Sequence, residues 1–102
     1  LRAARLAASP AQALEQAERV AAGMPTWTVT RVDPEKGTVE AVSESAVFGF
    51  QDDVVIRVRP DGAGSIVDVR SKSRDGKGDM GVNAARIRAY VAALEQAGAG
   101  AS

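Results

Sequence analysis

The pattern of hydrophobic and polar positions divides the chain into an initial helix, a run of strands and a final helix. Between residues 10 and 22 apolar residues recur every three or four positions, which is the period of an amphipathic helix. Ser9 stands before this segment as an N-cap, and Gln12 completes a capping box. Gly23 followed by Pro25 ends the pattern, so the sequence predicts a helix over residues 10–22.

The period changes after Pro25 from helical to alternating, and turn residues separate segments rich in β-branched side chains. In one of these segments Val54, Ile56 and Val58 alternate with mainly charged positions, which is typical of a strand with one buried face. The turns are short, so neighbouring strands are expected to be antiparallel. The predicted strands are Thr26–Val32, Thr38–Val47, Asp53–Arg59 and Ser65–Ser71.

A second amphipathic helix is predicted near the C-terminus, because apolar residues from Ile87 to Leu94 fall at i, i+3, i+4 and i+7. It is expected to start near residues 79–83 and to end near Gln96. Strands that lie between two helices favour an α+β fold of order α-β-β-β-β-α. Both terminal helices are expected to pack on one face of a four-stranded antiparallel sheet.

The length of 102 residues fits one domain with a modest core. Residues 1–8 are expected to be the end of a linker, residues 9–96 the single α+β domain, and residues 97–102 a disordered tail. Because the chain begins at Leu1 rather than Met, we expect it to be an excised domain or a processed product of a longer protein.

Composition excludes several classes of function. The 13 Lys and Arg residues balance the 13 Asp and Glu residues, so there is no basic footprint and no nucleic-acid partner is expected. The chain has no His and no Cys, which excludes zinc fingers, haem, iron–sulfur clusters, disulfides and His-dependent catalytic triads. No apolar run approaches the roughly 18 residues that a membrane helix needs.

The glycine-rich segment 76–81 matches the pattern G-x-G-x-x-G between a predicted strand and a predicted helix. A dinucleotide site needs a second parallel strand and a later acidic residue, and the chain ends after the helix, so no cofactor is expected. Anion binding by Arg74, Lys77 and the amides at the helix start is the remaining functional interpretation. The nearby aspartates lack the spacing of a calcium loop, and no metal is expected.

The charged side of the predicted sheet is a second candidate. Four arginines fall within eighteen residues, and their guanidinium groups suit carboxylate or phosphate ligands. The other interpretation is a solvated face of weak ion pairs. These four residues are Arg57, Arg59, Arg70 and Arg74.

Three of the four aromatic residues have both a structural and a functional interpretation. Trp27 shares a side with Val29 and is expected to be buried. Phe48 and Phe50 flank a corner between strands, where they either pack in the core or form an exposed apolar patch for a partner.

Several segments together resemble a known family: Val47 to Asp53, the strand that follows, and the string R-S-x-S-R…G…D-x-G-x-N-x-x-R-I. The sequence resembles the bacterial and plastid family catalogued as domain of unknown function 1499, over residues from about 6 to 94. The resemblance implies no established activity. It implies a cell-envelope location, because members often carry a lipoprotein signal or membrane helices before this domain. The string falls on Arg70, Ser71, Ser73, Arg74, Gly76, Asp79, Gly81, Asn83 and Arg86.

The sequence therefore favours a non-enzymatic binding or accessory domain of the bacterial cell envelope, monomeric or weakly dimeric. It is expected to contact an envelope protein or an anionic small molecule through the Arg-rich sheet face and residues 71–83. No catalytic residue is predicted. The alternatives are a hydrolase that uses Ser and Lys or paired carboxylates, and a structural module of a longer membrane protein. The candidate ligand-binding residues are Arg57, Arg70, Ser71, Ser73, Arg74, Lys77 and Asn83.

Overall fold

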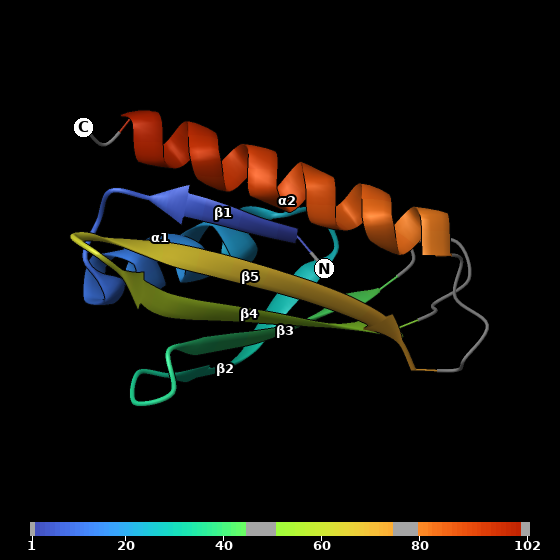
Figure 1. The fold of residues 1–102 in the computed structure, drawn as a ribbon. Coiled ribbons are helices and arrows are strands. Elements are labelled where there is room, and N and C mark those ends of the chain that lie inside the picture. The colour runs from blue at the N-terminus through green and yellow to red at the C-terminus, as the bar shows by residue number, and fades with distance from the viewer. Residues whose placement is uncertain (1, 45–50, 75–79, 101–102) are drawn as a thin grey trace.

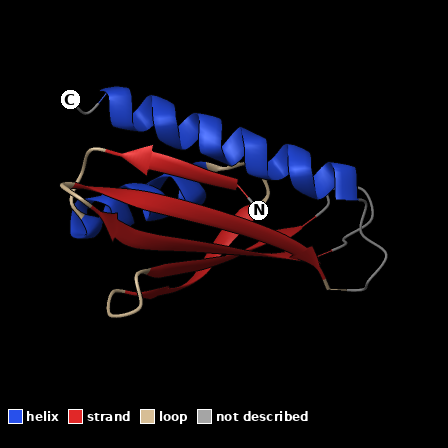
Figure 2. Cartoon of the chain, viewed as in Figure 1, coloured by secondary structure: helices blue, strands red, loops and turns tan. Residues whose placement is uncertain are grey.

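The computed structural model describes residues 2–44, 51–74 and 80–100, and these form one antiparallel sheet with both helices on the same face (Figures 1 and 2). The α+β class is confirmed. The elements are β1 (Arg2–Leu6), α1 (Pro10–Gly23), β2 (Trp27–Asp33), β3 (Thr38–Glu44), β4 (Gln51–Asp61), β5 (Gly64–Ser73) and α2 (Met80–Gly100).

The described sheet has five strands in the order β1-β5-β4-β3-β2, and this corrects the expected four. The additional strand, β1, lies in the segment expected to be the end of a linker, and it pairs with β5 in register, Ala4 opposite Val67. Ala4 and Leu6 are buried whereas Ala3 and Arg5 are exposed. Sequence reasoning missed this alternation because the strand has only five residues and one of its two buried side chains, Ala4, is small.

The first helix begins at Pro10 and has the N-cap and capping box that the sequence predicts. The Ser9 hydroxyl accepts from the Gln12 amide at 3.3 Å, and the Gln12 side chain accepts from the Ser9 amide at 3.4 Å. These reciprocal bonds satisfy amide donors that the first helical turn leaves without partners. Ala13, Ala17 and Ala21 are fully buried, so a stripe of small residues lets α1 lie close to the sheet.

The second helix begins at Met80, within the predicted range, and continues to Gly100. It therefore includes residues 97–100 of the segment expected to be a disordered tail. It contacts β1 and β5, whereas α1 contacts β2, β3, β4 and β5. In the described part of the chain, neither helix has a stretch that is long and apolar enough to cross a membrane.

The core lies between the helices and the sheet, as the predicted apolar sides require. The only tryptophan, Trp27, stacks on the only tyrosine, Tyr90, with ring centroids 5.3 Å apart. The Tyr90 hydroxyl donates to the Ala17 carbonyl at 2.8 Å and joins α2 to α1. Burial raises the pKa of Tyr90 because a phenolate loses its hydration there. The apolar positions that define the predicted strand and the second helix, Val54, Ile56, Val58, Ile87 and Leu94, are buried, and Val20 of α1 lies half-buried at the margin of the core.

A polar cluster beneath the start of α2

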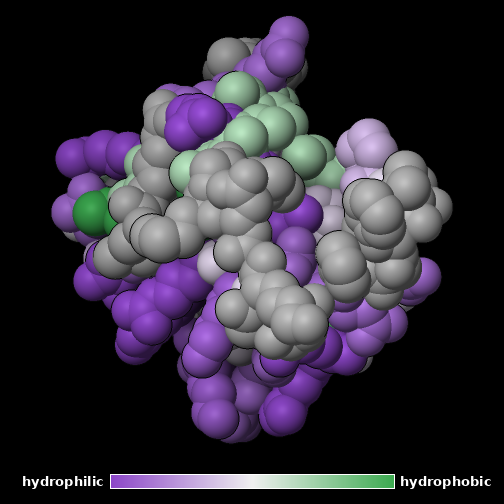
Figure 3. Space-filling view, turned by 90° about the vertical axis from the view of Figure 1, so that its right-hand side faces the viewer, coloured by the Kyte–Doolittle hydropathy of each residue, from purple (hydrophilic) through white to green (hydrophobic). Residues whose placement is uncertain are grey.

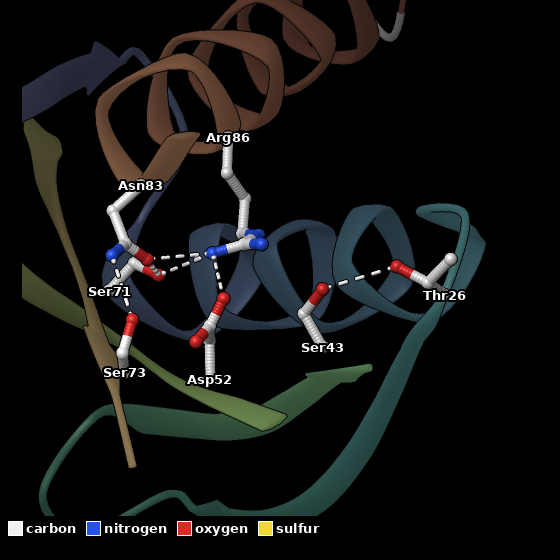
Figure 4. Close-up of polar contacts among 7 residues, drawn as sticks. All are labelled: Thr26, Ser43, Asp52, Ser71, Ser73, Asn83 and Arg86. Atoms are coloured by element: carbon white, nitrogen blue, oxygen red, sulfur yellow. Dashed lines mark hydrogen bonds and ion pairs between the residues drawn. The ribbon is translucent and has the colours of Figure 1, made fainter. Parts of the chain in front are cut away.

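The helix-covered face of the sheet changes from apolar to polar along β4 and β5. Asp52 lies directly between Ser43 on β3 and Ser73 on β5, and these three side chains point to the same face as the valines of the core. Alternation fixes this placement, because residues two apart on a strand share a face. The polar row lies at the end of the sheet where α2 begins (Figure 4).

Asp52 forms an ion pair with Arg86 of α2, with Nη1 2.8 Å from Oδ2. The side chains are only 12% and 15% exposed, so both charges have lost most of their hydration. Removing two charges from water costs more than their attraction returns unless further hydrogen bonds complete the site. The neighbours of this pair therefore decide whether it is stable.

Those neighbours are two serines of β5 and an asparagine one helical turn before Arg86. Nη1 of Arg86 donates to Asn83 Oδ1 at 2.7 Å and to the Ser71 hydroxyl at 3.1 Å. The Ser71 hydroxyl donates to Asn83 Oδ1 at 2.7 Å, and Asn83 Nδ2 donates to the Ser73 hydroxyl at 3.2 Å. The three-residue spacing puts both helical side chains on one face of α2. The network holds the first turns of that helix against β5.

Thr26 adds a strained position beside this network. Its φ of 68° lies in the left-handed region, which β-branched residues rarely adopt. The hydroxyls of Thr26 and Ser43 are 3.1 Å apart, and the Thr26 carbonyl accepts from the Glu44 amide at 3.1 Å. Such a conformation costs about 1–3 kcal/mol and tends to occur near functional sites.

The other two nitrogens of the Arg86 guanidinium, Nε and Nη2, point away from the acceptors that Nη1 contacts (Figure 4). With the described residues, Nε and Nη2 form no hydrogen bond. In Figure 4 this half of the guanidinium lies on the side of Ser43 and Thr26. Figure 3 views the molecule from the same end, and the described surface there is mainly hydrophilic.

The structure separates the seven predicted binding residues into different places. Ser71, Ser73 and Asn83 belong to the polar cluster, whereas Arg57 and Arg70 project from the opposite face of the sheet. Alternation explains the division, because Ser71 and Ser73 share the phase of the buried Val69 and Arg70 does not. The seven residues therefore do not form one site.

The two remaining predicted binding residues, Arg74 and Lys77, lie apart from the polar cluster or outside the described residues. Arg74 is exposed and engaged, since Nη2 lies 2.9 Å from Asp53 Oδ1 and Nη1 donates to the Gln51 side chain at 2.7 Å. The hydrogen bond and the charge of Asp53 raise the pKa of Arg74. Lys77, Phe48 and most of the glycine-rich segment lie outside the described residues.

Sequence reasoning missed Asp52 as a binding residue and reached Arg86 only through the family string. A signal for Asp52 was present: it occupies the same alternation phase as Val54 and Ile56, so an acid falls where the pattern requires an apolar side chain. Charged residues in a buried phase need a partner. The arginine just before Ile87 was the available candidate.

A separate groove of about 570 Å³ lies at the other end of β4, between the start of α1 and the β2–β3 turn. Leu14, Val32 and Val58 contribute apolar lining, and of the seven predicted residues only Arg57 lines it. The groove is therefore distinct from the polar cluster.

The fold and the cluster together define a small α+β domain with a five-stranded antiparallel sheet and a buried polar network under its second helix. The chain belongs to the family described as "Protein of unknown function (DUF1499)", whose model matches residues 1–94. Among curated proteins, none matches the chain.

Proposed function

We propose that this domain is a small non-enzymatic binding module and that the polar cluster binds a small anionic group, such as a carboxylate or a phosphate ester. One observation carries the proposal: with the described residues, Arg86 bonds through Nη1 alone. A guanidinium has five N–H donors in a rigid fork that matches planar oxyanions. The Nε and Nη2 donors of a largely buried side chain are thus available to a ligand.

The surroundings of these donors limit the charge of the ligand. Ser43 stands directly across from Asp52 in the β-sheet register, and its hydroxyl can contribute a further donor. Asp52 already neutralises Arg86, so the site has little net positive charge. A singly charged group therefore fits this site better than a multiply charged one.

The hydrolase alternative lacks a supporting observation. The Ser71 hydroxyl donates to Asn83 Oδ1, and an amide oxygen is not a base that could remove its proton. The Asp52 carboxylate is engaged by Arg86 at 2.8 Å, so it is not free to act on a substrate. The geometry accordingly favours binding over nucleophilic catalysis.

Acetate and dimethyl phosphate, which each carry a single negative charge, test the proposed site when each is compared with sodium chloride at the same ionic strength. We expect both anions to raise the melting temperature and to shift the Asn83 side-chain amide signals in NMR spectra. The Arg86→Lys variant keeps the positive charge but lacks the planar guanidinium, so the rise in melting temperature and the NMR shifts should disappear. The Ser43→Ala variant keeps the ion pair between Asp52 and Arg86 but loses one hydroxyl donor, so its response to the anions should be smaller.

Arg88→Lys is the matched control, because Arg88 is exposed on the same helix. Equal responses from Arg86→Lys and Arg88→Lys would contradict the proposal. A response to acetate and dimethyl phosphate no larger than that to chloride would also contradict it. A response to one of the two anions alone identifies which group the site prefers.

The proposal extends to location, on the basis of the family resemblance: the module serves a protein of the bacterial cell envelope. Fractionation of cells that express the full-length parent tests this point. We expect the parent in the membrane fraction after a carbonate wash. Its recovery in the soluble cytoplasmic fraction would refute the envelope location and leave the anion site untouched.

A further inference from the structure

The face of the sheet opposite the helices carries rows of charged side chains, many of them joined in ion pairs. Arg59 lies 2.7 Å from Asp68, and Arg74 lies 2.9 Å from Asp53. Arg5 lies 3.0 Å from Asp61 at one margin. Most of the carboxylates on this face are therefore already engaged.

Three cations of the same face form no ion pair with the described residues: Arg57, Arg70 and Lys72. The register explains why. Arg57 is directly opposite Asp68 and Lys72 is directly opposite Asp53, but other arginines bind those two carboxylates. Arg70 is opposite Val55 and has no carboxylate across from it.

The three cations lie beside an exposed apolar side chain, Val55, and the acid that faces it from β3, Glu40, lies 3.9 Å from Arg31. Among the described residues, Val55 is the large apolar side chain that stands exposed, at 38%. Arg57 follows it by two positions on β4, and Arg70 is its neighbour on β5. Residues two apart on a strand are about 7 Å apart, and diagonal neighbours on adjacent strands are separated by a similar distance. The result is an apolar centre with cations spaced about 7 Å apart.

We infer that this surface, defined by Val55, Arg57, Arg70 and Lys72, is the docking site for an acidic segment of a protein partner. Charge complementarity identifies the occupant, because three cations that form no ion pair with the described residues attract a partner with negative charge. An apolar centre within a polar rim is the usual anatomy of a protein interface. The matching segment carries carboxylates about 7 Å apart, as on alternate residues of an extended chain.

The mixture of signs on this face favours a protein over an anionic membrane. Asp53 and Asp68 are fixed within the surface, where they would repel a uniform layer of anionic headgroups. A protein partner can instead place its acids opposite the three cations and avoid the carboxylates. A small anion is less suited to this face, since small ligands bind in concave sites.

A synthetic acidic peptide of sequence Glu-Thr-Glu-Val-Glu-Thr-Glu tests the inference, with its Gln-substituted analogue as the uncharged control. We expect the acidic peptide to shift the backbone amide signals of Val55, Arg57, Arg70 and Lys72 in NMR spectra, and the analogue to have no effect. The triple variant Arg57→Gln, Arg70→Gln, Lys72→Gln should lower the affinity at least about tenfold. These side chains are exposed, so the fold should persist.

The matched control is Arg19→Gln, Arg88→Gln, Lys36→Gln, which makes the same change in net charge at exposed positions away from this face. Equal losses in the two triple variants would show non-specific attraction and overturn the inference. Vesicles of phosphatidylcholine and phosphatidylglycerol form a second arm. Binding of vesicles but not of the peptide would assign the face to a lipid surface and overturn the protein partner. Neither result bears on the anion site, which lies on the other face.

Discussion

The two ends of the helix-covered sheet face have the same backbone geometry and opposite chemistry. At one end Ile56 and Val69 are fully buried side by side, and at the other Asp52 and Ser73 occupy the equivalent positions. The apolar end gains stability from every methylene that it removes from water. The polar end must hold a charged pair out of water, where apolar side chains of similar volume are often as stable or more stable. Stability alone therefore does not account for the polar end.

The largest expected effect lies at the apolar end. Ile56→Ala should lower the free energy of unfolding by about 2–5 kcal/mol, because the side chain is fully buried and its loss leaves a cavity. Val55→Ala, one position along the same strand on the exposed face, should cost less than about 1 kcal/mol. Urea denaturation followed by Trp27 fluorescence measures both. Similar losses in the two variants would mean that the two faces are packed alike.

The polar end should respond differently to single and double replacement. Arg86→Met should cost about 3 kcal/mol, because it leaves the Asp52 carboxylate buried without its partner. The double variant Asp52→Leu, Arg86→Met should recover most of that loss, since no uncompensated charge remains. Denaturant titration of the single and double variants gives the comparison. A double variant that is much less stable than Arg86→Met would show that the pair is a net source of stability.

How far the sequence predicts these two regions follows from their chemistry. The apolar end was predictable because alternation and helical periodicity act on strongly hydrophobic residues such as Ile56 and Leu94. The capping box at Ser9 was predictable because its two hydrogen bonds join residues three apart. The strand β1 was not, because Ala4 adds little to an alternating signal and its pairing partner lies more than sixty residues away.

The polar cluster was predictable only in part, for a physical reason. Ser71, Ser73 and Asn83 were named through residue type and family string, and the structure places them on the face opposite to Arg57 and Arg70. An alternating pattern along the chain divides the residues of a strand between its two sides, and only tertiary packing decides which side the second helix covers. The pairing of Asp52 with Arg86 joins residues on different elements, and no local spacing encodes it.

Alkaline pH provides a further test of the apolar end. Burial raises the pKa of Tyr90, so between the unfolded value near 10 and the higher folded value the unfolded state loses a proton that the folded state keeps. Stability should therefore fall above pH 10, by up to about 1.4 kcal/mol per pH unit from this group. Because Tyr90 is the only tyrosine, its absorbance near 295 nm reports this titration alone. We expect phenolate to appear together with unfolding, and Tyr90→Phe to lower the pH dependence. Phenolate formation in the folded state near pH 10 would contradict the burial.

The smallest expected effect separates the buried ion pair from an exposed one on the opposite face. Arg59 and Asp68 are 2.7 Å apart, closer than Asp52 and Arg86, yet the Arg59 side chain is 50% exposed. Water and salt screen such a pair, so a double-mutant cycle with Arg59→Gln and Asp68→Asn should give a coupling energy below about 1 kcal/mol that shrinks further in concentrated salt. The equivalent cycle with Arg86→Gln and Asp52→Asn should give a larger coupling energy that salt changes little, because its charges are shielded from the solvent. If salt weakens the two pairs equally, then water reaches Asp52 and Arg86 freely. Burial would in that case no longer distinguish the polar cluster from the charged face, and distance alone would set the strength of each pair.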